Sequence, residues 1–257
     1  NKYCLYYKRK LIKIQGEYFR EGAGYIMRKL QWAAGILLSF SVIAILLISS
    51  FEIAMYADFS VYQREYEKYD VLDDLDMKME DVMYVTEEMM AYLRGDRDTL
   101  SVITTVEGQE QDFFNEQDRF HMGEVRDLFI GGLNIRTGAV VTALICLVFL
   151  IASKACLKKI LARSYQIALG ITGAAVIFIG AAALIDFNAV FVQFHHIFFD
   201  NDLWLFDPAE DYMIRMLPEG LFADMVLRIG LLFVGSLLIL LIISVLAGRF
   251  KKKQKSD

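Results

Sequence analysis

The three histidines of this chain stand near the ends of long apolar runs. His121 precedes the second apolar run, and the adjacent pair His195 and His196 follows the third. An imidazole can accept or donate a proton near neutral pH. Two imidazoles at one surface would suit acyl transfer, which needs a base for the attacking group and a donor for the oxyanion.

The adjacent pair also suggests a metal site. Metal ligands that share a helix are usually four residues apart, whereas adjacent residues point about 100° apart. A metal hypothesis therefore needs His195 together with Asp200, Asp202 or the distant His121. The sequence has no zinc-binding helix motif, nucleophile elbow or phosphate-binding loop. We predict a site that contains no metal ion.

Charged residues mark the ends of the four apolar runs at the same level as the histidines: Glu52, Arg136, Asp186 and Arg228. Charged residues commonly stand at the ends of membrane helices. Each of these four charges can be explained in this way without any further function. The functional hypothesis is that Arg136 or Arg228 helps to bind the oxyanion or a lipid carbonyl group.

The apolar runs account for the composition of the chain. Of its 257 residues, 56% are hydrophobic, and four stretches carry almost no charge. A helix needs ~20 apolar residues to cross a bilayer, with a range of about 17–25. We therefore predict an all-α polytopic membrane protein with one membrane domain over residues 1–257 and transmembrane helices at about residues 33–52, 137–153, 167–186 and 229–248.

Basic residues predict the orientation of these helices. They gather before the first run, in the link between the second and third runs, and in the C-terminal sequence GRFKKKQKSD. Lys and Arg near membrane ends are retained in the cytoplasm. We predict cytoplasmic termini and extracytoplasmic segments at about residues 53–136 and 187–228. The first run has the basic flank of a signal peptide, but its length predicts an uncleaved anchor.

The outer segments have the opposite charge. Residues 51–136 hold more than twice as many acidic as basic residues, although the net charge of the chain is only −5. No basic surface carries interleaved aromatic residues, so nucleic-acid binding is not expected. The basic inner ends fit anionic membrane lipid. An outward-facing thiol nucleophile is not expected either, because the cysteines lie in the inner tail, a span and an inner link: Cys4, Cys146 and Cys156.

The outer segments are predicted to be mainly helical. Apolar residues from Leu75 to Leu93 have helical spacing that Gly95 would end, and their methionines are expected to pack rather than to bind a ligand. The β-branched run 102–106 before a glycine predicts a short strand or hairpin. A further helix carries His121 into the second span. The second outer segment is broken by the two prolines of the chain, Pro208 and Pro218.

Two stretches resemble signatures of a known enzyme family. "HMGEVRDLF" (His121 to Phe129) resembles the HM-x-D-V signature of the bacterial lipoprotein intramolecular transacylases, with Glu124 where Asp is usual. "FHHIFFDNDLWLFDP" (Phe194 to Pro208) resembles their second signature, F-H-x-I-F-F-x-N-x-x-W-x-x-D-P. The stretch from Leu75 to Gly95 resembles the family's outer helix, so the likeness covers most of residues 75–222.

The resemblance implies a reaction and the residues that carry it. Members of the family move the sn-2 acyl chain of a diacylglyceryl-modified lipoprotein onto the α-amino group of its N-terminal cysteine. They consume no cofactor and no separate acyl donor, so the substrate supplies the nucleophile. His121 and His195 match the signature histidines, as base and oxyanion stabiliser in an order that stays open, and His196 is expected to face the interface or solvent. The supporting pocket residues would be Asn201, Trp204, Asp207 and Glu124.

Two other functions fit part of the sequence. A membrane-anchored sensor or partner protein would explain the acidic outer segments, but not the clustered histidines and aromatic residues. An outward-facing hydrolase would release the acyl chain to water, and differs from a transacylase only in what reaches the ester. The resemblance favours a transacylase that acts on diacylated lipoproteins and contacts membrane lipid at the extracytoplasmic face of a bacterial cell membrane.

Overall fold

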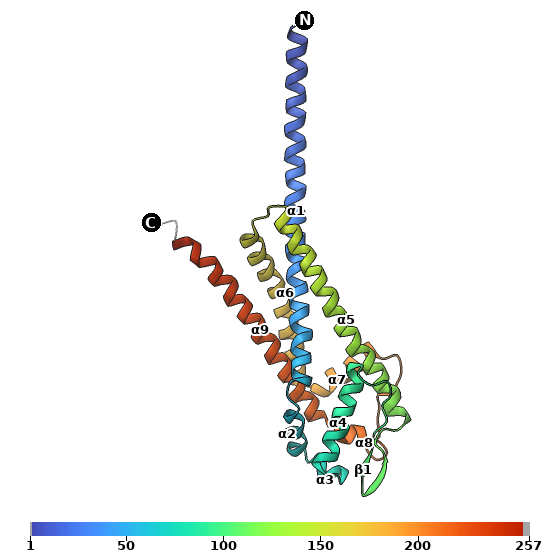
Figure 1. The fold of residues 1–257 in the computed structure, drawn as a ribbon. Coiled ribbons are helices and arrows are strands. Elements are labelled where there is room, and N and C mark those ends of the chain that lie inside the picture. Colours follow the sequence, from blue (N-terminus) through green and yellow to red (C-terminus); the bar gives the residue numbers. More distant parts are fainter. Residues whose placement is uncertain (1, 254–257) are drawn as a thin grey trace. The chain divides into compact units, whose positions relative to one another are not determined.

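The computed structural model describes the backbone of residues 2–253 and the side chains of residues 22–246. Helices predominate in this part of the chain, beside one two-stranded sheet (Figure 1). The helices are α1 (Lys2–Tyr56), α2 (Ser60–Lys68), α3 (Val71–Leu75), α4 (Met79–Arg94), α5 (Glu116–Ala152), α6 (Leu157–Ile185), α7 (Phe187–Phe198), α8 (Tyr212–Met216) and α9 (Glu219–Lys253). The strands are β1 (Ile103–Val106) and β2 (Gln109–Asp112). The predicted mainly helical fold with a short hairpin is confirmed.

Some features of the sequence fall outside the described side chains. Cys4 and most basic residues before the first apolar run precede residue 22. The basic sequence GRFKKKQKSD follows residue 246. The predictions drawn from these residues stay predictions.

Four helices in the described part of the chain are long and apolar enough to cross a membrane. They are Gly22–Tyr56 of α1, Glu116–Ala152 of α5, Leu157–Ile185 of α6 and Glu219–Leu246 of α9. Only 11% of the most apolar stretch of α5 and 6% of that of α6 is buried inside the protein. Large apolar surfaces are unfavourable in water. These helices are therefore suited to a lipid environment.

The chain divides into two compact units. The first unit consists of Asn1–Ile43, Ala139–Thr172 and Ile239–Asp257. The second unit consists of Ala44–Gly138 and Gly173–Leu238, and it contains all the residues of the candidate site. Each of the helices α1, α5, α6 and α9 contributes residues to both units.

In the first unit, α1 and α6 approach closely at Gly35. A Cβ atom at Gly35 would lie 2.5 Å from Cγ2 of Ile160 and 2.7 Å from Oγ of Ser164. Both of these side chains are buried. Nearby, Nε2 of Gln31 on α1 donates a hydrogen bond of 3.1 Å to the carbonyl oxygen of Ser153, which satisfies a backbone group just after the end of α5.

An apolar core holds the second unit together. It joins α2, α3, α4, the hairpin, α8 and the beginning of α9, and Figure 1 shows α2, α3, α4, α8 and β1 gathered together. The methionine-rich helix packs into this core, where Met89 and Met90 are only 3% and 1% exposed, although both residues also line the cavity described below. The predicted helix stop is confirmed, since Gly95 ends α4 with a φ of 90°.

The predicted short strand is one half of an antiparallel hairpin. Ile103 lies opposite Asp112, and the two strands are joined by Glu107 and Gly108. These two residues have φ values of 51° and 75°. A two-residue hairpin loop with positive φ at both positions is a type I′ turn, in which glycine is favoured.

Aspartates separate helices at two places in the second unit. Leu75 ends α3, and Asp76 with a φ of 48° separates it from α4, so the predicted single helix is in two pieces. The third apolar run ends at Asp186, as the sequence predicted, and a separate helix follows it. At Asp186 the backbone is extended, and Oδ1 accepts a hydrogen bond of 2.9 Å from the backbone N of Ala189. Aspartate is a favoured N-cap, so α7 begins anew after it.

We expect the substitution G35A to destabilise the protein, because the added methyl group has no space between Ile160 and Ser164. Overpacking of this kind costs ~1–3 kcal/mol. The matched control is G170A on α6, where nothing lies within 4 Å of the added Cβ. Thermal unfolding in detergent should show a lower midpoint for G35A than for G170A. Equal midpoints would contradict the close approach of α1 and α6.

Candidate active site

Two of the three histidines lie side by side in the second unit. His121 is on the second turn of α5 and His195 on the third turn of α7, and their ring centroids are 5.9 Å apart with planes at 27°. They are 5% and 7% exposed, whereas His196 is exposed. The helical period therefore turns only one member of the adjacent pair toward His121.

Aromatic side chains enclose both imidazoles. Phe199 contacts both, with ring centroids 4.9 Å from His121 and 5.4 Å from His195. Trp204 packs on His195 at 4.7 Å, and Phe206 packs on His121 at 5.5 Å. All three aromatic residues follow α7. The second signature therefore supplies both a histidine and the apolar surroundings of the pair.

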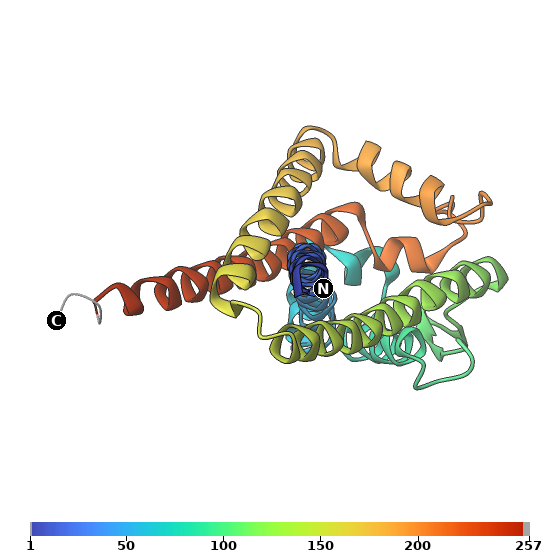
Figure 2. The ribbon, with the colours of Figure 1, turned by 90° about the horizontal axis from the view of Figure 1, so that it is seen from above.

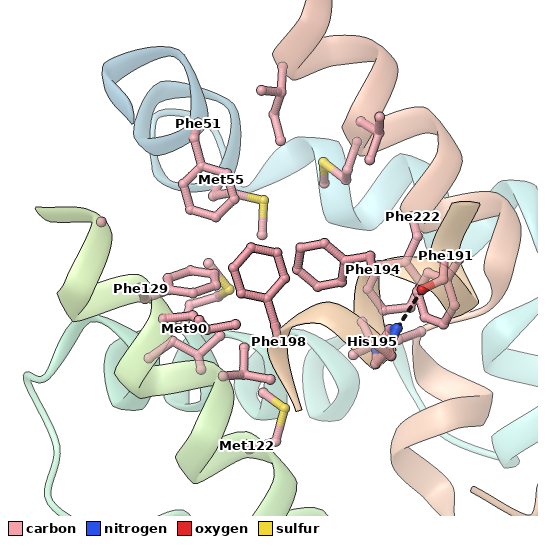
Figure 3. Close-up of a pocket in the computed structure, with 18 of the residues that line it drawn as sticks. Phe51, Met55, Met90, Met122, Phe129, Phe191, Phe194, His195, Phe198 and Phe222 are labelled. Carbon is pink, nitrogen blue, oxygen red and sulfur yellow. Dashed lines mark hydrogen bonds between the residues drawn. The ribbon is translucent and has the colours of Figure 1, made fainter. Parts of the chain in front are cut away.

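One hydrogen bond determines the tautomer of His195. Its Nδ1 lies 2.8 Å from the carbonyl oxygen of Phe191, one turn earlier on α7 (Figure 3). A carbonyl oxygen only accepts, so Nδ1 carries the hydrogen and donates it. In the neutral ring, Nε2 then has a free lone pair that can accept a proton. Burial lowers the pKa of His195 and favours this neutral form.

His121 has a carboxylate beside it. Its Nδ1 makes no hydrogen bond and lies 3.9 Å from Oε2 of Glu124, three residues along α5. The other carboxylate oxygen, Oε1, accepts a hydrogen bond of 2.8 Å from Nδ2 of Asn201. Glu124 belongs to the first signature and Asn201 to the second. The structure therefore joins the two signatures directly beside His121.

The histidines line a large apolar cavity. Its volume is about 830 Å³, within the ~300–1,000 Å³ that is usual for small-molecule sites. Nine phenylalanines and six methionines line it, and no serine, threonine or cysteine of the described residues does. Figure 3 shows Phe194 and Phe198 of α7 pointing into the cavity, with Phe51 and Met55 of α1 facing them. Such walls suit a long apolar ligand and offer it no hydroxyl or thiol nucleophile.

Side chains of α5 hold the loop that follows α7. Nε2 of Gln117 donates hydrogen bonds to the carbonyl oxygens of Leu203 and Leu205, at 3.0 Å and 3.1 Å. Figure 2 shows this loop reaching the beginning of α5. The two carbonyl groups flank Trp204, so Gln117 restrains the backbone on both sides of the ring that packs on His195.

Two of the predicted site residues shape the backbone instead of lining the cavity. Asp207 is exposed, and its Oδ1 accepts a hydrogen bond of 2.9 Å from the backbone N of Ala209. Asp186 caps the N-terminus of α7. Each aspartate therefore stabilises a turn in the segment that carries the second signature.

Glu52 is the centre of an ion-pair cluster. Nη2 of Arg94 lies 3.4 Å from Oε1 of Glu52, and Arg136 pairs with Oε2 of the same carboxylate. Glu52 and Arg94 line the cavity, whereas Arg136 does not. Arg228 lies on α9 within electrostatic range of Asp58, also outside the cavity lining. The two arginines therefore lie outside the cavity lining, and their proposed contact with an oxyanion or a lipid carbonyl group stays a prediction.

Sequence reasoning missed several residues that contact the histidines or hold their loop: Phe191, Phe199, Phe206 and Gln117. Phe191 could have been found, because it precedes His195 by four residues and so shares its helix face. Phe199 follows His195 by four residues and could have been found in the same way. The contacts of His121 with Phe199 and Phe206, and those of Gln117 with the loop, join residues far apart in the sequence, and no local pattern indicates them. Among the described side chains, no three His, Cys, Asp or Glu residues are grouped so that they could hold a metal ion.

The fold is similar to that of a solved membrane protein. The membrane-integral lipoprotein intramolecular transacylase Lit from Bacillus cereus matches with a TM-score of 0.67 over 91% of this chain and 99% of that chain, at 22% sequence identity. A variant of that protein with one histidine replaced by arginine matches with a TM-score of 0.69 over 94% and 100% of the two chains, at 21% identity. At these identities the likeness concerns the fold.

The sequence also matches a family. No curated protein matches the chain. The family model of the lipoprotein intramolecular transacylase Lit matches residues 36–222, a stretch that includes both histidine signatures and most of the chain. The chain therefore belongs to the lipoprotein intramolecular transacylase family, whose members are acyltransferases.

Proposed function

We propose that this protein moves the sn-2 acyl chain of a diacylglyceryl-modified lipoprotein onto the α-amino group of the lipoprotein's N-terminal cysteine. The product is an N-acyl lyso-lipoprotein. The observation that carries the proposal is the buried pair His121 and His195, with ring centroids 5.9 Å apart, in the wall of an apolar cavity. Family membership and the four candidate membrane helices support a lipid-anchored substrate.

Two imidazoles can carry the protons that this transfer moves. A neutral imidazole accepts a proton from the α-ammonium group, and the free amine attacks the ester carbonyl carbon. The nitrogen then loses a second proton, and the bond between the carbonyl carbon and the sn-2 oxygen breaks. An imidazolium gives that oxygen a proton. The products are an amide and a hydroxyl group, and one proton is released overall.

The nucleophile in this proposal belongs to the substrate. No described serine, threonine or cysteine lines the cavity. The two cysteines whose side chains are described, Cys146 and Cys156, are free thiols of the first unit. The described lining of the cavity therefore has no serine, threonine or cysteine on which an acyl-enzyme could form. Attack by the amine of the substrate does not require such a residue.

Hydrolysis at the same site is the second candidate. It requires water beside the ester, and a lining dominated by phenylalanine and methionine offers water few hydrogen-bonding partners. A purely binding role leaves the two buried imidazoles beside the cavity unexplained. The apolar lining of the cavity therefore favours transfer to the amine over transfer to water.

We further propose that the reaction takes place at the extracytoplasmic face. The link between α5 and α6 and the first turns of α6 carry four basic residues, which are Lys154, Lys158, Lys159 and Arg163. Basic residues at membrane ends are retained in the cytoplasm. His121 lies at the opposite end of α5 from this link, which supports an outward-facing site.

The first expectation is that the purified protein in lipid isomerises a defined diacyl lipopeptide without any added phospholipid. Transfer leaves the mass of the lipopeptide unchanged, and fragmentation in a mass spectrometer should find one acyl chain on nitrogen. Loss of a whole acyl chain would show hydrolysis instead. An unchanged lipopeptide, or a requirement for phospholipid, would refute intramolecular transfer.

A second expectation concerns the adjacent histidines. H195A and H121A should each reduce N-acylation by ~100-fold or more, because each removes an imidazole from the proton transfers. H196A should keep most of the activity, because His196 is exposed and its ring is not part of the pair. Rates are compared at matched expression and thermal stability. An inactive H196A beside an active H195A would reverse this assignment.

The proposal also requires a neutral His195, which predicts a pH dependence of stability. Burial lowers the pKa of His195 in the folded state, whereas an unfolded histidine has a pKa of about 6.5. Below that value the unfolded state binds more protons, so stability should fall as the pH falls from about 7.5 to about 5.5. H195F should lose less stability than the wild type over this interval. Thermal midpoints with the same pH dependence would contradict the burial of a neutral imidazole.

A further inference from the structure

Two buried polar atoms beside the site lack partners and complement each other. Nδ1 of His121 and Oε2 of Glu124 are both buried without a hydrogen bond, and they lie 3.9 Å apart. Leaving a buried polar group unpaired is unfavourable. An imidazole N–H and a carboxylate oxygen satisfy each other, and an approach of about 1 Å would bring them to hydrogen-bonding distance.

Glu124 is already held on its other side. Its Oε1 accepts the hydrogen bond of 2.8 Å from Nδ2 of Asn201, whose own Oδ1 accepts one of 3.0 Å from the backbone N of Leu203. The amide is therefore oriented by the loop and presents an N–H group to the carboxylate. This leaves Oε2 of Glu124 as the oxygen nearer to His121. Among the described residues, Glu124 is the one carboxylate that lies within 4 Å of an imidazole nitrogen.

We propose that Glu124 is a positioning residue for His121, with Asn201 holding Glu124 in place. The carboxylate keeps the hydrogen of His121 on Nδ1 and leaves the lone pair on Nε2. This inference rests on the acyl transfer proposed above and assigns the two histidines different tasks. His121 is the imidazole that takes the proton of the α-ammonium and keeps it until the sn-2 oxygen leaves.

The reason for this division is the difference between the two Nδ1 partners. A carboxylate stabilises an imidazolium through a charge-assisted hydrogen bond. The partner of His195 is the uncharged carbonyl group of Phe191, which gives a protonated ring less stabilisation. The remaining ring contacts of His121 are Phe199, Phe206 and His195 itself, none of which supplies a negative charge.

The substitution E124Q tests this role. The new amide would keep its carbonyl oxygen toward the Asn201 donor and so turn its NH₂ group toward Nδ1 of His121. Nδ1 would then have to accept, and the hydrogen would move to Nε2. We expect kcat with a diacyl lipopeptide to fall ~100-fold or more with little change in KM, as for other histidines forced into the wrong tautomer. E124D keeps the carboxylate and should stay within ~10-fold of the wild type.

A spectroscopic measurement separates positioning from a general structural effect. The chain has three histidines, so the ring resonances of nitrogen-labelled protein can be assigned with single substitutions. At neutral pH, Nε2 of His121 should be unprotonated in the wild type and protonated in E124Q. The control is E116Q, which removes an exposed carboxylate from the same helix and should alter neither kcat nor the tautomer. The same His121 tautomer in wild type and E124Q, or full kcat in E124Q, would overturn the proposal.

A second variant keeps the test decisive if E124Q is unstable. N201A retains the carboxylate but frees it, so the NMR spectrum should show a mixture of His121 tautomers and kcat should fall less than expected for E124Q. A single tautomer with full kcat in N201A would refute the part assigned to Asn201. If the wild type does not isomerise the lipopeptide, the proposed function fails, whereas the tautomer measurement still decides the role of Glu124.

Discussion

The site depends on holding polar imidazole rings inside an apolar cavity while leaving one nitrogen of each ring free to react. Burying a polar group costs free energy unless it is hydrogen-bonded. The carbonyl oxygen of Phe191 provides this for His195 and uses Nδ1, so Nε2 stays available. The bond needs a donor and an acceptor one helical turn apart. The new start of α7 at Asp186 therefore matters, because it begins the short helix that contains both residues.

A segment without regular secondary structure gives the cavity its aromatic wall. Residues 199–211 follow α7 and form neither a helix nor a strand, so no regular backbone hydrogen bonds hold them. Side chains of α5 and of the residue before it hold the segment instead: Gln117 donates to two carbonyl groups, Asn115 donates to Asp211, and Glu124 accepts from Asn201. Backbone groups of a packed loop need partners of this kind. The position of Trp204 on His195 therefore depends on a helix that is distant in the sequence.

Local sequence patterns predicted the structure correctly where it depends on residues that are close together in the chain. The helical period separates His195 from His196, and Gly95 ends its helix as expected. Patterns placed Asp186 at the end of the third apolar run, but they did not predict that its side chain would cap a separate helix through a hydrogen bond from the backbone N of Ala189. They also could not pair Phe206 with His121, because that contact depends on the path of a loop. Periodicity specifies which face of a helix is buried, but not which distant ring will meet it.

The substrate itself explains why few polar residues suffice for the proposed reaction. The amine and the ester belong to one substrate molecule, so their encounter costs less translational entropy than a reaction between two molecules. What remains is the folding of a flexible lipid so that the amine meets the sn-2 carbonyl carbon. Rigid aromatic walls can impose that conformation without forming a covalent bond. The histidines then have only protons to move, and neutral rings in an apolar cavity can do this. No nucleophilic side chain therefore has to stand beside them.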